Sequence, residues 1–180
     1  ELFASQGALQ FRTFLKKLCD LGIVSQSLES QKPQSMDERL FSRFITEISY
    51  LQKYESKDQT CFDFFNNVRN AKVTIIGLGG NGSLLAMMLA ASGVGSLHLV
   101  EGDHVEESNL VRQIFYTEAD AKEKRFKADC LKERLELFSS HTSVTVSKKF
   151  MQSEKDVEAE ISNSDCLILC ADMPRFILNR

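Results

Sequence analysis

Apolar runs and stretches with helical spacing alternate along most of this chain. Strand patterns occur at residues 73–76, 97–100, 142–147 and 166–171, and the first and last of these read as buried strands. Helical patterns lie between them, at residues 83–92, from residue 121 to about residue 138, and at residues 153–161. The alternation predicts an α/β fold: a Rossmann-like, mostly parallel sheet with helices on both faces.

The polar residues 117–120 are expected to cap the second of these predicted helices, and Ser153 the third. The predicted inner stripe of the second helix is Ala128, Leu131, Leu135 and Phe138, with Lys127 on its edge, so that this lysine is expected to point at a partner.

The chain ahead of the first strand carries helical patterns instead. Residues 8–20 place apolar side chains at helical spacing, and residues 21–24 read as a short extended piece. Residues 25–34 are polar, include a proline and predict a linker. Residues 36–51 predict a helix, and residues 54–70 predict a helix and loop that pack on the sheet. The predicted buried stripe of the 36–51 helix is Phe41, Phe44, Ile45 and Ile48.

A glycine-rich turn follows the first strand, at residues 77–82. Gly77 allows a sharp exit from the strand, Gly79 or Gly80 allows backbone N–H groups to approach a phosphate, and Gly82 allows close packing of the next helix on the sheet. Glu101 follows the second strand, about 20 residues past the turn, where an acid commonly meets ribose hydroxyls. The pattern favours nucleotide binding over the alternative, a tight turn without a ligand.

The composition is ordinary for a soluble globular protein of 180 residues, with 43% hydrophobic and 26% charged side chains. A net charge of −3 gives no electrostatic footprint for nucleic acid. No apolar run approaches the roughly 20 residues of a membrane span, and no secretory signal is present. The five cysteines form no Cys-x-x-Cys pair, which predicts buried thiols in a reducing cytoplasm.

Three segments carry a more specific signal. Residues 77–83 read Gly-Leu-Gly-Gly-Asn-Gly-Ser, residues 90–95 read Ala-Ala-Ser-Gly-Val-Gly, and residues 108–113 read Ser-Asn-Leu-Val-Arg-Gln. Together they resemble the ThiF/MoeB family, which is built around the adenylation domain of ubiquitin-activating enzymes. The resemblance implies an enzyme that uses ATP and Mg²⁺ to activate a carboxylate.

The resemblance also implies site residues. The cofactor-binding set for ATP is Gly77, Gly79, Gly80, Asn81, Gly82, Glu101, Asp103, Asn109 and Gln113. The catalytic set is Arg43, Arg112, Lys127 and Asp172. In this scheme Arg43 reaches across a homodimer interface to the phosphates, and Asp172 holds Mg²⁺ at the end of the last strand. The alternative to a phosphate-binding role is that Arg43 is an ordinary exposed arginine of its helix. For Lys127 the alternative is that its alkyl chain lies along the surface and its charge faces water.

Two departures from the family pattern affect the site. Glu101 stands where the family commonly has aspartate, so its carboxylate reaches one methylene further. Phe126 replaces a proline before Lys127, and the approach to that lysine is two residues longer than usual. This leaves Lys124 or Arg125 as substitutes for Lys127.

Two domains are predicted. Residues 1–34 are expected to be the end of a winged-helix, leader-peptide-binding module plus a linker, similar to the modules of peptide-modifying members such as the microcin C adenylating enzyme and the pantocin enzyme. An N-terminal helix packing on the main domain is the alternative. Residues 35–180 are expected to be the ATP-binding adenylation domain, with more of it beyond residue 180. A structural zinc is expected only if cysteine pairs lie there.

The preferred hypothesis is therefore ATP- and Mg²⁺-dependent activation of a carboxylate on a ribosomally made precursor peptide, during antibiotic biosynthesis. Adenylation of a ubiquitin-like sulfur-carrier protein is the second hypothesis. An NAD-binding dehydrogenase fits the glycine turn but leaves the Ser-Asn-Leu-x-Arg-Gln run, Arg43 and Asp172 unexplained. A non-catalytic partner-binding domain also remains open. Whether attack falls on the α- or the γ-phosphate is open as well.

Overall fold

The computed structural model describes residues 11, 13–18, 21 and 27–171. Within the first helical pattern, residues 13–18 are helical, as predicted. The extended piece at 22–24 and the catalytic candidate Asp172 lie outside the described residues, as does Cys19. The predicted leader-binding module therefore stays a prediction. No helix among residues 27–171 or the described residues before them is long and apolar enough to cross a membrane.

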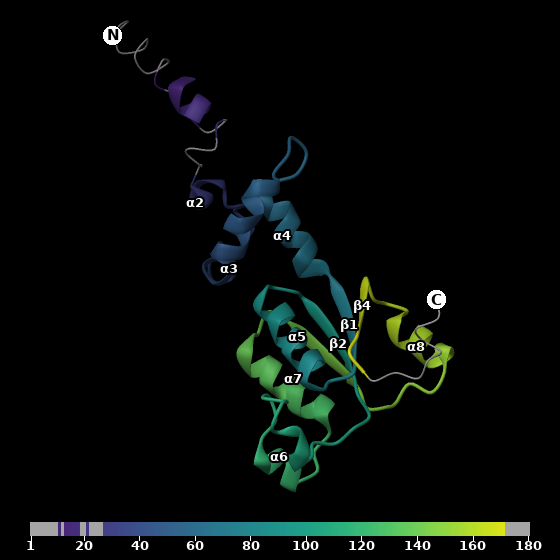
Figure 1. Cartoon of the computed structure of the whole chain (residues 1–180). Coiled ribbons are helices and arrows are strands. Elements are labelled where there is room, and N and C mark those ends of the chain that lie inside the picture. Colours follow the sequence, from purple (N-terminus) through teal and green to yellow (C-terminus); the bar gives the residue numbers. More distant parts are fainter. Residues whose placement is uncertain (1–10, 12, 19–20, 22–26, 172–180) are drawn as a thin grey trace, which may run out of the picture.

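A four-stranded parallel sheet forms the centre of the chain (Figure 1). Its strands are β1 (Lys72–Ile76), β2 (Ser96–Val100), β3 (Ser143–Ser147) and β4 (Cys166–Leu169), in the order β3-β2-β1-β4. Strand β1 pairs with β2 on one side and with β4 on the other, both in parallel register. The sheet confirms the Rossmann-like fold, and the strand order reverses direction beside β1.

Helices cover both faces of the sheet, as predicted. Helices α5 (Gly80–Ala91) and α7 (Lys127–Phe138) lie together on one face, and α8 (Glu154–Ile161) lies on the other (Figure 1). The strands alternate accordingly, because successive side chains point to opposite faces. Ile75 and Leu99 join the core under α5 and α7, whereas Ile76 and Val100 join the core under α8.

A second apolar cluster lies ahead of the sheet. Helices α3 (Glu38–Leu51) and α4 (Cys61–Asn70) pack against each other, with the short helices α2 (Leu28–Gln31) and η1 (Gln52–Tyr54) beside them. Phe44 and Phe65, both fully buried, meet at a ring-centroid distance of 5.3 Å. The aromatic side chains of α4 therefore pack mainly on α3, and the prediction that they pack on the sheet is wrong in this respect.

Helix boundaries differ from the predictions in three places. Residues 25–34 contain α2, whose Leu28 is buried, so the segment is not only a polar linker. The helix after the glycine turn begins at Gly80, three residues earlier than predicted. The predicted helix ending at residue 138 is two helices, α6 (Glu118–Lys122) and α7, because Lys124 adopts a left-handed backbone with φ of 49°.

Burial corrects four further predictions. Ile45 and Phe138, both placed in buried stripes, are exposed. Strand β4 was predicted to be buried, but it is only partly covered because it forms an edge of the described sheet. Among the described cysteines, Cys61 and Cys130 are buried as predicted, whereas Cys166 is exposed.

Candidate nucleotide-binding site

Several of the predicted site residues follow directly on the carboxyl ends of β1 and β2, beside that of β4. Strand β1 runs into the glycine turn, β2 runs into Glu101, and β4 runs into Cys170 and Ala171. Strand β1 continues to β2 on one side, and the chain returns with β4 on the other. In open α/β sheets, ligands bind outside the carboxyl ends of the strands at such a reversal of strand order.

Two glycines make this turn sterically feasible. Gly77 has a φ of 91°, and a Cβ there would overlap the backbone of Ala171. A Cβ on Gly82 would overlap the carbonyl oxygen of Gly77. Helix α5 therefore starts in direct contact with the turn.

The first turn of α5 presents free backbone donors. Gly79 is the N-cap residue, and no side chain caps the helix. Among the described residues, none accepts a hydrogen bond from the N–H groups of Gly79, Gly80, Asn81 or Gly82. Unpaired N–H groups and the partial positive charge of the helix dipole together favour an anion at this end.

Gln113 supplies a second, independent sign of a ligand. Its side chain is 4% exposed and lies beside Gly79, yet its Oε1 has no hydrogen-bond partner among the described residues. Buried amide groups are rarely left unpaired, so such a group calls for a ligand, an ion or a water. Asn109 is also buried, and its Oδ1 accepts a hydrogen bond from the N–H of Glu106 at 3.1 Å. Asn109 therefore fastens this loop, and the side chain of Gln113 lies beside the start of α5.

Glu101 is tied to the glycine turn. Its Oε2 accepts a hydrogen bond from the N–H of Leu78 at 2.9 Å, and its Oε1 accepts one from the N–H of Asp103 at 3.1 Å. The carboxylate stays half-buried at the end of β2. It is placed to meet a polar group of a ligand that lies over the turn.

Lys127 is buried and forms an ion pair with Asp103, which follows Glu101 after the end of β2. Its side chain is only 7% exposed, and its Nζ lies 3.1 Å from Oδ2 of Asp103. Its backbone N–H also donates to the carbonyl oxygen of Asp103 at 3.0 Å. Lys124 is exposed and Arg125 pairs with Asp120 at 3.2 Å, so neither substitute takes this position. The structure brings Lys127 to Asp103.

The structure places the two predicted arginines, Arg112 and Arg43, in different surroundings. Arg112 is exposed and donates to the carbonyl oxygen of Ser108 at 2.8 Å, while its own carbonyl oxygen stands 3.0 Å from where a Cβ of Gly80 would be. Arg43 donates to the carbonyl oxygen of Phe138 at 3.1 Å, at the last residue of α7. Lys127 is the first residue of that helix, roughly 16 Å away along its axis. Arg43 is therefore not brought to the site of its own chain.

One aromatic residue beside the site was not predicted. The ring of Phe150 lies against Gly102, where a Cβ would stand 2.7 Å from the ring, and Phe150 is 58% exposed. Gly102 separates Glu101 from Asp103. A glycine between two acids was the one signal in the sequence that another group approaches the backbone there.

The ThiF family pattern matches residues 53–179. The chain belongs to the ThiF family. Two similar proteins are adenylyltransferases. An adenylyltransferase and sulfurtransferase of Aspergillus niger is 37% identical to this chain over 59% of this chain and 22% of its own length. The sulfur carrier protein ThiS adenylyltransferase of Escherichia coli is 31% identical over 76% of this chain and 51% of its own length.

Two solved structures share the fold. A crystal structure of PaaA matches 89% of this ThiF-family chain and 49% of its own, with a TM-score of 0.75 and 25% identity. E. coli MccB, solved with AMPCPP and MccA, matches 87% of this chain and 52% of its own, with a TM-score of 0.67 and 24% identity. The chain thus spans about half the length of these structures and of the E. coli relative, and about a fifth of the fungal one.

The site fits the phosphates of a nucleotide. The free N–H groups lie at the start of α5, and the buried ammonium of Lys127 pairs with Asp103, two residues after the Glu101 that holds the turn. The unpaired Oε1 of Gln113, beside Gly79, is an acceptor and suits a donor such as a hydroxyl group or a water. Among the described residues, no cluster of three His, Cys, Asp or Glu side chains could hold a metal ion by itself. Nucleotide-bound Mg²⁺ commonly takes one or two protein carboxylates, and Asp103 is the described carboxylate beside Lys127.

Proposed function

We propose that this ThiF-family chain is the ATP-binding part of an enzyme that activates a carboxylate by adenylation. The observation that supports this most strongly is the buried Lys127, which pairs with Asp103, two residues after the Glu101 that holds the glycine turn ahead of the uncapped α5. A buried lysine and a helix start with free backbone N–H groups both suit a ligand with several negative charges, such as a triphosphate.

The chain's own groups would act by holding the phosphates and neutralising their charge. The N–H groups of Gly79 to Gly82 would donate to phosphate oxygens, and Lys127 would exchange its bond with Asp103 for one with the triphosphate. Glu101 would accept hydrogen bonds from the ribose hydroxyls. Mg²⁺, held by Asp172 with help from Asp103, would supply further charge neutralisation when bound.

In the adenylation step, an oxygen of the substrate carboxylate forms a bond to the α-phosphorus of ATP. The bond from that phosphorus to the oxygen bridging the α- and β-phosphates breaks, and pyrophosphate leaves. The transition state spreads negative charge over the phosphate oxygens, so fixed positive groups and aligned N–H donors accelerate it. Lys127 and Arg112 would supply positive charge, and the backbone of Arg112 lies against Gly80 in the first turn of α5.

We propose a ribosomally made precursor peptide as the substrate, in antibiotic biosynthesis. This choice is supported by the similarity to PaaA and to MccB, the latter solved with MccA, and by the helical segment ahead of the ThiF-family region. A ubiquitin-like sulfur carrier is the second candidate, which the similarity to ThiS adenylyltransferases supports. The family membership favours both over an NAD-dependent dehydrogenase.

We propose that the enzyme works as a homodimer. Arg43 lies at the far end of α7 from Lys127, so it reaches phosphates only in a second subunit. In this chain it is already ordered by its bond to Phe138 and by the Phe138 ring, 5.1 Å from its guanidinium. A cytoplasmic location agrees with the use of ATP and is part of the same proposal.

Substrate-dependent exchange between labelled pyrophosphate and ATP tests the proposal. The full chain is mixed with Mg²⁺-ATP and either a candidate precursor peptide or a ubiquitin-like carrier that ends in Gly-Gly. Exchange with the peptide supports the preferred substrate, and exchange only with the carrier supports the second candidate. Absence of exchange with both, while ATP binding is retained, counts against adenylation.

A further inference from the structure

Tyr116 is a buried residue to which the proposed site gives no task. It lies between the Ser-Asn-Leu-x-Arg-Gln run and α6, and only 5% of it is exposed. Its hydroxyl donates a hydrogen bond to the carbonyl oxygen of Leu78 at 2.7 Å. Burial, aided by the nearby carboxylate of Glu101, raises the pKa of Tyr116 above its usual range. The phenol therefore stays protonated and acts as a donor.

Leu78, in the middle of the glycine turn, is held at both backbone polar groups. Its N–H donates to Glu101 at 2.9 Å, and its carbonyl oxygen accepts from Tyr116. Each peptide unit is planar, and its N–H and C=O point in opposite directions in the trans form. A bond that fixes the carbonyl of Leu78 therefore also fixes the direction of the N–H of Gly79.

The N–H of Gly79 is one of the free donors at the start of α5. Glycine restricts its own backbone weakly, because it lacks a Cβ. Leu78 is flanked by Gly77 and Gly79, so the peptide unit between Leu78 and Gly79 has little steric reason to keep one orientation. The hydrogen bond from Tyr116 supplies that reason.

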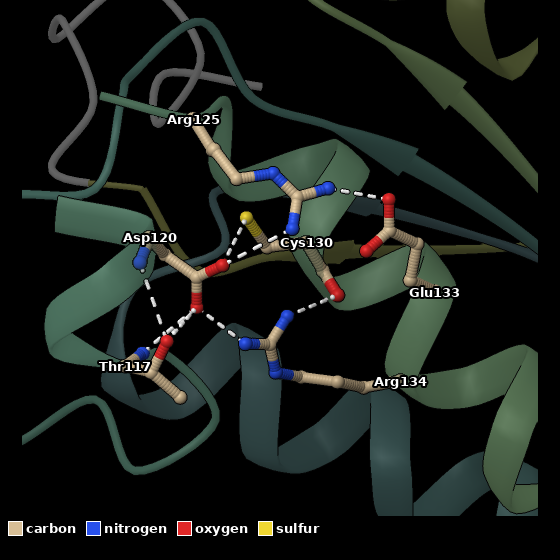
Figure 2. A network of polar contacts seen from close by, with 6 residues as sticks. All are labelled: Thr117, Asp120, Arg125, Cys130, Glu133 and Arg134. Carbon is tan, nitrogen blue, oxygen red and sulfur yellow. Dashed lines mark hydrogen bonds and ion pairs between the residues drawn. The ribbon is translucent and has the colours of Figure 1, made fainter. Parts of the chain in front are cut away.

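A network of polar side chains anchors the segment that carries Tyr116 (Figure 2). Asp120 is 3% exposed and lies at its centre. It accepts hydrogen bonds from the backbone and hydroxyl of Thr117, at 2.8 and 2.7 Å, and pairs with Arg125 and Arg134. Because Thr117 directly follows Tyr116, the network fixes the base of the tyrosine against α7.

We propose that Tyr116 is a positioning residue for the nucleotide: its hydroxyl, through the carbonyl of Leu78, aims the N–H of Gly79 at a phosphate. This inference rests on the proposed ATP site. It predicts an effect on phosphate binding specifically, because the bond acts on a backbone donor to phosphate. Binding of the nucleoside portion does not depend on it.

The test compares ATP with adenosine, which lacks phosphates, in Tyr116→Phe. The matched control is Tyr50→Phe, which removes the same atom from an exposed tyrosine on α3. Calorimetric titration of the full chain is expected to give about tenfold weaker ATP binding in Tyr116→Phe, since a misdirected donor loses a hydrogen bond to a charged group. Adenosine binding is expected to stay unchanged, and Tyr50→Phe to match the wild type with both ligands.

Equal losses for ATP and adenosine would overturn the inference, because they would indicate a general disturbance of the site. Unchanged ATP binding in Tyr116→Phe would also overturn it, while the proposed function would stand. A wild-type chain that binds no ATP would refute the proposed function itself, and the inference with it. If Tyr116→Phe does not fold, nuclear magnetic resonance of the wild-type chain supplies the test. Addition of ATP must then shift the amide resonance of Gly79, and addition of adenosine must leave it in place.

Discussion

Replacement of Lys127 by methionine separates a functional lysine from a structural one. The side chain is 7% exposed, and its partner Asp103 is 54% exposed. A half-exposed ion pair is screened by solvent and contributes only about 0–1 kcal/mol to stability. Methionine keeps most of the length of the side chain, and the Asp103 carboxylate left without its partner is half exposed, so that water solvates its charge.

Lys127→Met is therefore expected to keep its free energy of unfolding within about 1 kcal/mol of the wild type. If Lys127 neutralises phosphate charge, the same change should lower the rate of substrate-dependent pyrophosphate exchange by about 10²–10³-fold, the loss typical of a fixed group that stabilises transition-state charge. Urea unfolding and the exchange assay give the two numbers from one preparation.

The matched control is Lys132→Met, which removes a charge from a partly exposed position of the same helix, where Lys132 pairs with Glu136 at 3.6 Å. It should leave both quantities unchanged. The reasoning is refuted if Lys127→Met loses more than about 2 kcal/mol of stability while the exchange rate falls less than tenfold. Lys127 would then hold the fold together instead of acting on ATP.

Three further outcomes are expected. Gly82→Ala should abolish ATP binding in titrations, or prevent folding, because its Cβ would overlap the carbonyl oxygen of Gly77. Burial alone would raise the pKa of Asp120, but its hydrogen bonds and ion pairs lower the pKa below the usual value. Its contribution to stability is therefore complete above the unfolded pKa of about 3.9 and is lost as the pH falls through the lower folded pKa, so urea unfolding of Asp120→Asn should show less dependence on pH below about 4. Cys166 is exposed, whereas burial raises the pKa of Cys61 to about 12, so a thiol reagent followed by mass mapping should label Cys166 in the folded protein and Cys61 only after unfolding.

The sheet and the glycine turn were predictable because their signals are local. A β-branched run, a turn of glycines and an apolar helix follow one another within about 20 residues, and each carries its own backbone preference. Helix caps are equally local: the sequence predicts them at residues 117–120 and at Ser153, and the structure has capping boxes that begin at Thr117 and Ser153. The direction of Lys127 followed from its place on the inner edge of a helix.

The remaining features depend on contacts between distant segments. Tyr116 and Leu78 are 38 residues apart, and no local pattern marks their hydrogen bond. The backbone of Phe44 departs from helical geometry inside α3, with φ of −111° and ψ of 16°, so the simple stripe that placed Ile45 in the core fails there. The exposure of β4 follows from its position at the edge of the sheet, which strand patterns alone do not reveal.

The most direct test of the central claim is the fate of the carboxylate oxygen of the substrate. The full chain is supplied with Mg²⁺-ATP and a precursor peptide whose reactive carboxylate carries ¹⁸O, and the acyl product is captured by a nucleophile. Adenylation predicts pyrophosphate and AMP that contains one ¹⁸O atom, since the carboxylate oxygen attacks the α-phosphorus. Appearance of ¹⁸O in inorganic phosphate, together with ADP, would contradict adenylation and would place the attack on the γ-phosphorus.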